Sequence, residues 1–344
     1  MSRFEDEMRM ARTPRPRQDL RDRGVSRRAI AGAAYERSTR GYHRRAAISS
    51  SGISSSGSLG PPTSAQRILD ATAVLPPGAL LGGWAAAYVH GVDDLDGRDH
   101  LTLAPLPVPI LLPPGLRRRS TPALSYRQSA RPPRSETVHE LPVTTLWRTV
   151  FDLARWAPDV TEAVVAVDAV LAARLLTRGT LERHISSAPS RRGIAQVRTA
   201  VTLARAGVRS PWESRLRMFA TPEVGMVTLQ PNRAVFDRSG RLLGIPDLLD
   251  TDAGLAIEYD GASWRAERSH GHRDRRQHRE YNIREERLER AGLVVVRVDK
   301  ADLIQHRTEL AGRLRAARAE GMDRDRGRDG WTVDEPEGWY GLPA

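Results

Sequence analysis

The chain has 344 residues, which is long enough for two domains with buried cores. Its formal net charge of +12 and pI of about 10.9 favour a polyanionic partner, most simply nucleic acid, although a GC-rich genome would give the same excess of arginine over lysine. It contains no cysteine, which excludes a disulfide framework, thiolate catalysis and a cysteine-ligated zinc site.

The hydropathy pattern also argues against a helical membrane span. No apolar run reaches the roughly 18 residues that such a span needs. The N-terminus is charged and arginine-rich, without the hydrophobic core of a secretory signal. We therefore expect a soluble, cytoplasmic protein with no membrane partner, and the sequence does not indicate its oligomeric state.

The first 62 residues predict an arm, a small module and a linker. Residues 1–18 are polar and contain the run Pro-Arg-Pro-Arg, which predicts a disordered basic arm. Within residues 19–48 we expect short helices at 19–24 and 26–33 and a small hairpin at 35–43, the order of a shortened winged helix-turn-helix. Residues 49–62 are rich in serine and glycine and predict a flexible linker.

Residues 63–208 predict an α+β domain, because stretches of helical apolar spacing alternate with short β-rich runs. Helices are expected at residues 66–73, 82–91, 144–156, 160–173, 180–185 and 192–206. Short strands, separated by proline-rich turns, are expected at residues 101–103, 108–112 and 123–127.

Residues 209–320 predict an α/β domain in which helices flank a mixed sheet. Helices are expected at residues 211–220, 273–290 and 303–317, and strands near residues 226–229, 234–236, 242–250, 255–260 and 293–298. The last of these strands is a continuous apolar run, which is typical of a strand covered on both faces. The tail, residues 321–344, carries Trp331, Trp339 and Tyr340 among acidic residues, and the sequence does not place it.

Carboxylates converge in the hairpin that residues 245–260 predict. If residue 250 opposes residue 255 across the turn, Asp247 faces Glu258, and the period of two adds Asp260 to the same face. Opposed like charges repel, so we expect a cation to offset them, and Mg²⁺ is typically held by one or two carboxylates together with phosphate oxygens. A hydrated polar face without a ligand explains the same residues, and a one-residue slip of the register would separate the pair.

These residues resemble motifs of a nuclease family. Ile-Pro-Asp247 followed by Ile-Glu258-Tyr-Asp260-Gly is similar to the second and third motifs of the PD-(D/E)xK fold, and more narrowly to domains of unknown function related to very-short-patch-repair endonucleases. The same pattern continues in Ser210-Pro-Trp-Glu213, in residues 282–286 before Gly292, and in residues 294–298 leading to 301–303. The resemblance covers residues 210 to about 317, and it implies a restriction-endonuclease-like sheet and phosphodiester hydrolysis.

The resemblance also implies a role for each acid. Asp247 and Glu258 would ligate a divalent metal and Glu213 would approach from the helix, with the metal polarising the scissile phosphate and activating water. Ser210-x-x-Glu213 is equally the pattern of a helix capping box, so a structural role for Glu213 stays open. Asp260 stands where the family's third motif has its catalytic lysine, as in the relatives that share the Glu-x-Asp-Gly pattern, and this leaves catalysis open.

A basic run follows the acids directly. It consists of Arg265, Arg268, Arg273, Arg275, Arg276 and Arg279. Arginines beside a metal site suit contacts with DNA phosphates, although an ordinary charged helix face explains them as well, because acids are interleaved. His270, His272 and His278 lie in the same stretch and are candidates for a general base, with a solvated surface role as the commoner alternative.

The region before residue 209 resembles a second family. Its motifs are Gly-Trp84-Ala-Ala-Ala-Tyr88-Val-His-Gly91, Leu141-Pro-Val-Thr-Thr145, Arg148-Thr-Val-Phe-Asp-Leu153 and Arg192-Gly193. They are similar to the AbiEi-type antitoxins of type IV toxin–antitoxin systems. This resemblance implies a DNA-binding region, a cognate toxin as partner, and a winged helix whose Arg27 and Arg28 face DNA. A disordered basic arm explains these two arginines as well.

Two functions follow from the sequence. The first is a metal-dependent DNA endonuclease-like protein, with catalytic Glu213, Asp247, Glu258 and Asp260 around Mg²⁺ or another divalent cation. The alternative is a catalytically inactive DNA-binding transcriptional regulator or antitoxin. The sequence does not decide between DNA and RNA.

Overall fold

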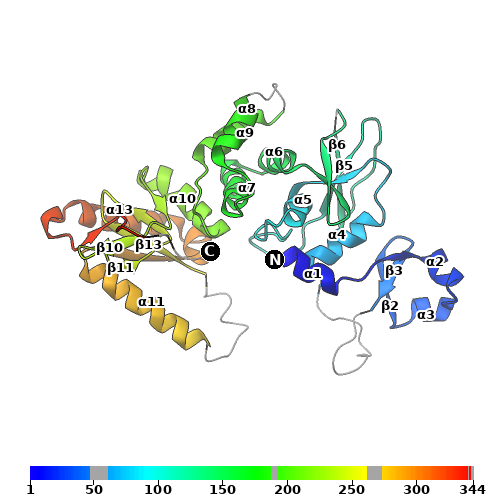
Figure 1. Cartoon of the computed structure of the whole chain (residues 1–344), viewed down its shortest axis with the longest axis horizontal. Coiled ribbons are helices and arrows are strands. Elements are labelled where there is room, and N and C mark those ends of the chain that lie inside the picture. Colours follow the sequence, from blue (N-terminus) through cyan, green and yellow to red (C-terminus); the bar gives the residue numbers. More distant parts are fainter. Residues whose placement is uncertain (47–60, 130, 187–191, 262–272, 340, 342–344) are drawn as a thin grey trace. The chain divides into compact units, whose positions relative to one another are not determined.

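The computed structural model describes the chain outside residues 47–60, 130, 187–191, 262–272, 340 and 342–344, and it describes no side chains for residues 273–281. The described residues divide into two compact units, residues 1–158 with 173–199 and residues 159–172 with 200–344 (Figure 1). The boundary predicted at residue 209 therefore lies near residue 200. Helix α7 (Val160–Ala172), predicted within the earlier domain, belongs to the second unit because it packs against α10 (Pro211–Val224).

The first unit opens with a module of short elements. Its helices are α1 (Arg3–Met10), α2 (Arg17–Asp22) and α3 (Arg27–Ala31), and its strands are β1 (Arg15–Pro16), β2 (Tyr35–Thr39) and β3 (Tyr42–Arg45). Strand β3 pairs antiparallel with both β1 and β2. The order of two helices followed by a hairpin, predicted for residues 19–48, is confirmed. Residues 49–60 of the linker predicted at residues 49–62 lie outside the described residues.

The disordered arm predicted for residues 1–18 is wrong. Ser2 and Glu5 form a reciprocal capping box at the start of α1, in which Ser2 Oγ accepts from Glu5 N and Glu5 Oε2 accepts from Ser2 N. Phe4 is fully buried and meets the ring of Tyr88 edge-on at a centroid distance of 5.8 Å. Hydrogen bonds between Arg12 and Gln66 and the pairing of β1 with β3 also hold this segment, although its composition is polar.

The rest of the first unit is built on a five-stranded mixed sheet with the order β6-β5-β4-β8-β7. Its strands are β4 (Leu80–Leu81), β5 (Val108–Leu112), β6 (Leu124–Gln128), β7 (Ser135–Val138) and β8 (Leu141–Thr144). The helices in this part of the chain are α4 (Ser64–Thr72), α5 (Gly83–Val89), α6 (Leu146–Trp156), α8 (Arg178–Ser186) and α9 (Ile194–Leu203), of which α9 runs across the unit boundary. The strand predicted at residues 101–103 is absent, since Leu103 has a φ of 59° and lies in an exposed turn.

The second unit holds two sheets. The larger has the order β14-β13-β12-β9, with β13 and β14 parallel and the other pairs antiparallel, and the smaller is the antiparallel sheet β11-β10-β15. The strands are β9 (Gln230–Pro231), β10 (Val235–Asp237), β11 (Leu242–Gly244), β12 (Leu248–Asp250), β13 (Leu255–Asp260), β14 (Val294–Asp299) and β15 (Trp331–Thr332). Besides α7 and α10, the helices are α11 (Arg273–Arg290), α12 (Lys300–Ile304), α13 (Arg307–Met322) and the 3-10 helix η2 (Arg326–Arg328). The mixed α/β class is thus confirmed.

Helices and a second sheet cover the two faces of the larger sheet (Figure 1). On one face, Leu248 and Ile257 pack with apolar residues of α10 and α13. On the other, Leu249 and Ala256 pack with Leu288 of α11 and with the smaller sheet. This alternation is the one predicted for the hairpin, and it places Glu258 on the face covered by α11.

Two features of this unit differ from the sequence prediction or go beyond it. The strand predicted at residues 242–250 is two strands in different sheets, and Pro246, which has no N–H for a ladder, lies between them. The tail docks, because β15 pairs with β10 and the Trp339 ring meets Phe236 edge-on at 5.0 Å. Within the described part of the chain, no helix is both long and apolar enough to span a bilayer.

Candidate active site

The register of the central hairpin brings Asp247 to Glu258. Leu248 pairs with Ile257 and Asp250 with Leu255, which is the predicted register. Asp247 directly precedes β12, and its Oδ2 accepts a hydrogen bond of 2.8 Å from the Tyr259 N–H. Burial raises the pKa of Glu258, and the charge of Asp247 adds to this shift, so the two acids lie within electrostatic reach of each other.

Glu258 is a buried acid with one paired oxygen. Its side chain is 13% exposed, and Oε2 accepts a hydrogen bond of 2.6 Å from Arg284 Nη2 on α11. Oε1 is buried and accepts no hydrogen bond from any residue that the structure describes. Burial, joined by repulsion from Asp247, raises the pKa of Glu258 to about 8, although Arg284 opposes this shift.

Glu213 joins the pair from the first turn of α10. Its backbone N–H donates to Ser210 Oγ at 3.2 Å, so Ser210 caps the helix as the sequence predicts. Its Oε2 accepts from the Arg209 N–H at 2.9 Å and from Asn232 Nδ2 at 2.6 Å. Burial and the charge of Asp247 raise the pKa of Glu213 to about 7. One carboxylate therefore both stabilises the helix start and lies within electrostatic reach of Asp247.

Asn232 ties two of these acids together, and sequence reasoning missed it. Its N–H donates to the Asp247 carbonyl oxygen at 3.0 Å, while its Nδ2 donates to Glu213 and to the Gly207 carbonyl oxygen at 3.0 Å. Its φ of +50° lies in the left-handed region, where asparagine is among the best tolerated residues. The Pro-Asn step predicts a turn there, but nothing local in the sequence links that turn to Glu213.

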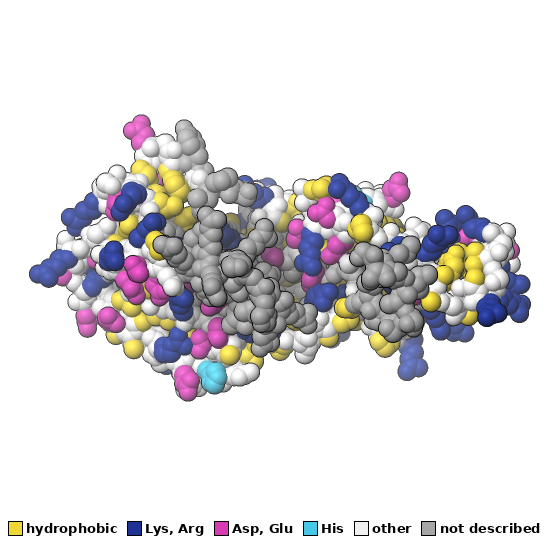
Figure 2. Space-filling view, turned by 90° about the horizontal axis from the view of Figure 1, so that it is seen from below, with side chains coloured by type: hydrophobic (Ala, Val, Ile, Leu, Met, Phe, Trp, Pro, Cys, Tyr) yellow, Lys and Arg dark blue, Asp and Glu magenta, His cyan; other side chains and the backbone are white. Residues whose placement is uncertain are grey.

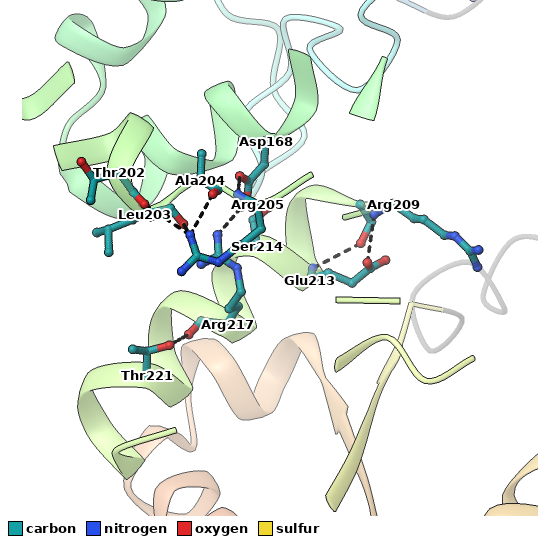
Figure 3. A network of polar contacts seen from close by, with 11 residues as sticks. Asp168, Thr202, Leu203, Ala204, Arg205, Arg209, Glu213, Ser214, Arg217 and Thr221 are labelled. Carbon is teal, nitrogen blue, oxygen red and sulfur yellow. Dashed lines mark hydrogen bonds and ion pairs between the residues drawn. The ribbon is translucent and has the colours of Figure 1, made fainter. Parts of the chain in front are cut away.

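A second network fixes α10 from its other side. Ser214 Oγ and Arg217 Nη2 donate to Asp168 Oδ2 on α7, at 2.8 and 2.9 Å, and the Arg205 N–H donates to Asp168 Oδ1 at 2.7 Å. Figure 3 shows Ser214 and Arg217 turned toward Asp168, whereas Glu213 extends toward Arg209. The helix that carries Glu213 is thus held by buried polar contacts on the opposite side.

Asp260, the fourth predicted acid, lies two residues beyond Glu258 at the end of β13. It pairs in register with Asp299 of β14, and its charge acts on Tyr259, whose pKa is raised mainly by burial. The charge of Asp247, by contrast, acts on both Glu213 and Glu258. The structure therefore groups three of the four predicted acids and leaves Asp260 farther along the strand.

The predicted nucleic-acid contacts fall in two places. Arg27 and Arg28 are exposed on α3, and Figure 2 shows Arg side chains gathered on the surface of this module, to the right of the view. The second group has no described side chains: Arg265, Arg268, His270 and His272 lie outside the described residues, and Arg273, Arg275, Arg276, Arg279 and His278 lie on the part of α11 described by its backbone alone.

The acids fit a divalent cation with few protein ligands. Among the described residues, no three His, Asp or Glu side chains are placed to hold a metal ion together. Mg²⁺ needs only one or two carboxylates when phosphate oxygens and water complete its shell. Asp247 and Glu258 supply that number, and the buried Glu258 Oε1 is an acceptor that a cation would satisfy.

Comparison with family models and with curated proteins gives no match for this chain. Among solved structures, the crystal structure of the RV2827C protein from Mycobacterium tuberculosis is similar at a TM-score of 0.34 and 16% sequence identity, covering 62% of this chain and 78% of that one. A likeness at this level assigns neither a fold family nor a function.

Proposed function

We propose that the chain is a divalent-metal-dependent phosphodiesterase of the endonuclease type that acts on DNA, with a restriction-endonuclease-like second unit. The observation that carries the proposal is the grouping of Asp247, Glu258 and Glu213, three carboxylates with raised pKa values, around the start of one hairpin. Such grouping is typical of catalytic sites. The net charge of +12 supports a polyanionic substrate.

Asp247 and Glu258 would hold the metal ion. Bound there, Mg²⁺ would supply positive charge to the scissile phosphate and lower the pKa of the attacking water. Asp247 is oriented by the Tyr259 N–H, which donates to Oδ2, and a carboxylate has further lone pairs that could face the ion. Glu258 Oε1 has no competing donor among the described residues.

Glu213 is suited to proton transfer at neutral pH, because burial places its pKa at about 7. Two donors hold Oε2, so we assign Oε1 as the oxygen that accepts the proton. In the proposed reaction the water oxygen attacks phosphorus, Glu213 accepts the water proton, the bond to one ester oxygen breaks, and that oxygen takes a proton from solvent.

Plasmid nicking by the full chain in Mg²⁺ tests the proposal. We expect Asp247→Asn and Glu258→Gln each to lower the nicking rate by a factor on the order of 100 or more, because each removes a metal-binding charge worth several kcal/mol in the transition state. Asp323→Asn, which neutralises an exposed acid at the end of α13, should nick like wild type. Absence of nicking by wild type, or equal rates for Asp247→Asn and wild type, would exclude the enzyme.

A specific observation favours the second candidate function. The module that contains α3 and the β2–β3 hairpin exposes Arg27, Arg28, Arg37 and Arg40, which suits a DNA-binding transcriptional regulator or antitoxin with a cognate toxin as partner. In that case DNA binding persists in EDTA and does not respond to Asp247→Asn.

A further inference from the structure

Arg284 extends into the acid cluster from α11. Its Nη2 lies 2.6 Å from Glu258 Oε2, and its positive charge also acts on Asp247. The side chain is 28% exposed, so the guanidinium is not sealed behind the carboxylates. A guanidinium keeps its charge at any pH that the protein meets. Arg284 therefore places a cation at Glu258, within electrostatic reach of Asp247.

The absence of a side chain at Gly244 leaves room for the Arg284 side chain to reach the acids. A Cβ at Gly244 would lie 2.9 Å from Arg284 Cγ and 3.2 Å from its Cδ, so the arginine stem crosses directly over the backbone of β11. Gly244 is not among the glycines with a positive φ, so its own backbone does not require glycine. The close approach of Arg284 is the physical reason for the missing side chain.

A divalent ion on Glu258 would change what Arg284 can bind. The ion and the guanidinium compete for the same carboxylate, and their like charges repel at that distance. The positive charge of the guanidinium favours a further anion beside it. A phosphate suits it, because the planar fork of N–H groups donates two parallel hydrogen bonds to phosphate oxygens.

We propose that Arg284 is a substrate-binding residue that exchanges Glu258 for the scissile phosphate when the metal ion binds. This inference rests on the proposed function and adds a residue to it. Without the ion, Arg284 offsets the charge of the two carboxylates. With the ion and DNA present, it donates to nonbridging phosphate oxygens and stabilises the negative charge that they gain during attack.

Two measurements on one set of variants test the exchange. The first is calorimetric titration of the full chain with Mg²⁺ in the absence of DNA, and the second is the single-turnover cleavage rate. Arg284→Met should bind Mg²⁺ about tenfold more tightly, because a competing cation is lost, yet cleave on the order of 100-fold more slowly. Gly244→Ala should shift both quantities in the same directions with no change of charge, since its Cβ displaces the arginine stem.

Arg290→Met is the matched control on the same helix. Its side chain is 80% exposed and pairs with Glu286, so both quantities should equal those of wild type. Opposite changes in metal affinity and rate are the signature of the exchange. If Arg284→Met weakens both, Arg284 only braces Glu258 and the inference is overturned, as it is if neither quantity changes.

The proposed function and this inference fail in different ways. A wild-type chain that neither binds Mg²⁺ nor cleaves DNA overturns the proposed function, and the inference with it. A wild-type chain that does both, with an Arg284→Met variant that matches it, overturns the inference alone. Circular dichroism shows whether each variant keeps the wild-type fold. If Arg284→Met loses the fold, Gly244→Ala, which keeps Arg284, tests the inference in its place.

Discussion

Glu213 and Glu258 lie in surroundings that disfavour their ionised forms. Burial raises the pKa of Glu213 to about 7 and that of Glu258 to about 8, both above the ordinary value of 4.5. In the unfolded chain both acids ionise near 4.5, so between that pH and about 8 the folded state binds more protons than the unfolded state. The free energy of unfolding therefore falls as the pH rises through this window.

Replacing Glu258 with glutamine should remove most of its share of this dependence. The free energy of unfolding of Glu258→Gln minus that of wild type should increase by on the order of 3 kcal/mol from pH 5 to pH 8, because the amide has no charge to bury. Guanidinium unfolding curves at several pH values measure the difference. Glu289→Gln, an exposed position on α11, should run parallel to wild type, and parallel curves for Glu258→Gln would contradict the burial argument.

The sequence predicted the acids of the site better than their partners. The alternation of polar and apolar residues fixes the hairpin register, and therefore the meeting of Asp247 and Glu258, because a one-residue slip would bury charges in the α10 face. Asn232 and Arg284 reach the site through long-range contacts, from residues 19 and 26 positions away from their partners. No local pattern encodes such pairings, so sequence reasoning gave Asn232 no part in the site and included Arg284 only within the motif of residues 282–286.

At the scale of elements, α10 is held by a buried ion pair. Arg217 and Asp168 have side chains that are 5% and 1% exposed, with 2.9 Å between Nη2 and Oδ2. Arg217 Nη1 also donates to the Leu203 carbonyl oxygen at 2.9 Å. A buried pair of this kind adds little net stability over apolar residues, but breaking it leaves one charge uncompensated.

Asp168→Ala should therefore lower the free energy of unfolding of the second unit by about 3–5 kcal/mol, since it strands the Arg217 guanidinium. The double variant Asp168→Ala/Arg217→Met should recover part of this loss because no buried charge remains. Denaturant unfolding followed by circular dichroism measures both. Glu286→Ala removes the partner of Arg290, an exposed pair, and should cost less than about 1 kcal/mol. A single variant no less stable than this control would refute the argument.

Periodicity predicted most elements, and the failures have physical causes. Helix α11 begins and ends where its pattern predicts, and Gly292 follows with a φ of 98°. Helix α10 runs on to Val224 although Pro222 lies inside it, and it ends at Gly225 in the left-handed region. The sequence predicted its end at residue 220. A proline usually interrupts a helix, and here the packing of the apolar face of α10 overrides that local preference.

At the scale of the whole molecule, positive charge is concentrated near the N-terminus. Residues 15–46 contain ten arginines and three acids, which gives +7 of the chain's +12. Arg44 is buried and pairs with Glu36 and Asp70, so it serves the fold. Most of the others are exposed. Such a concentration would favour the binding of a polyanion in both candidate functions, whether or not the second unit cleaves it.

Removing two of these charges should weaken DNA binding and its dependence on salt together. For Arg27→Ala/Arg28→Ala, the slope of log affinity against log salt should decrease in magnitude by about 2. Binding releases about 0.9 counterions for each phosphate contact, and this variant loses two such contacts. Fluorescence anisotropy of a labelled duplex, measured in EDTA to prevent cleavage, gives the slope. Loss of affinity should be uniform across duplex sequences, since phosphate contacts do not read bases.

A second double variant separates local contact from net charge. Arg241→Ala/Arg328→Ala removes the same total charge from exposed side chains of the second unit, which are 76% and 89% exposed. If the module around α3 binds DNA, this control keeps the wild-type slope, because the phosphate contacts then come from the arginines of the module and not from Arg241 or Arg328. If both double variants lower affinity equally, the attraction comes from the charge of the whole chain, and the module has no binding surface of its own.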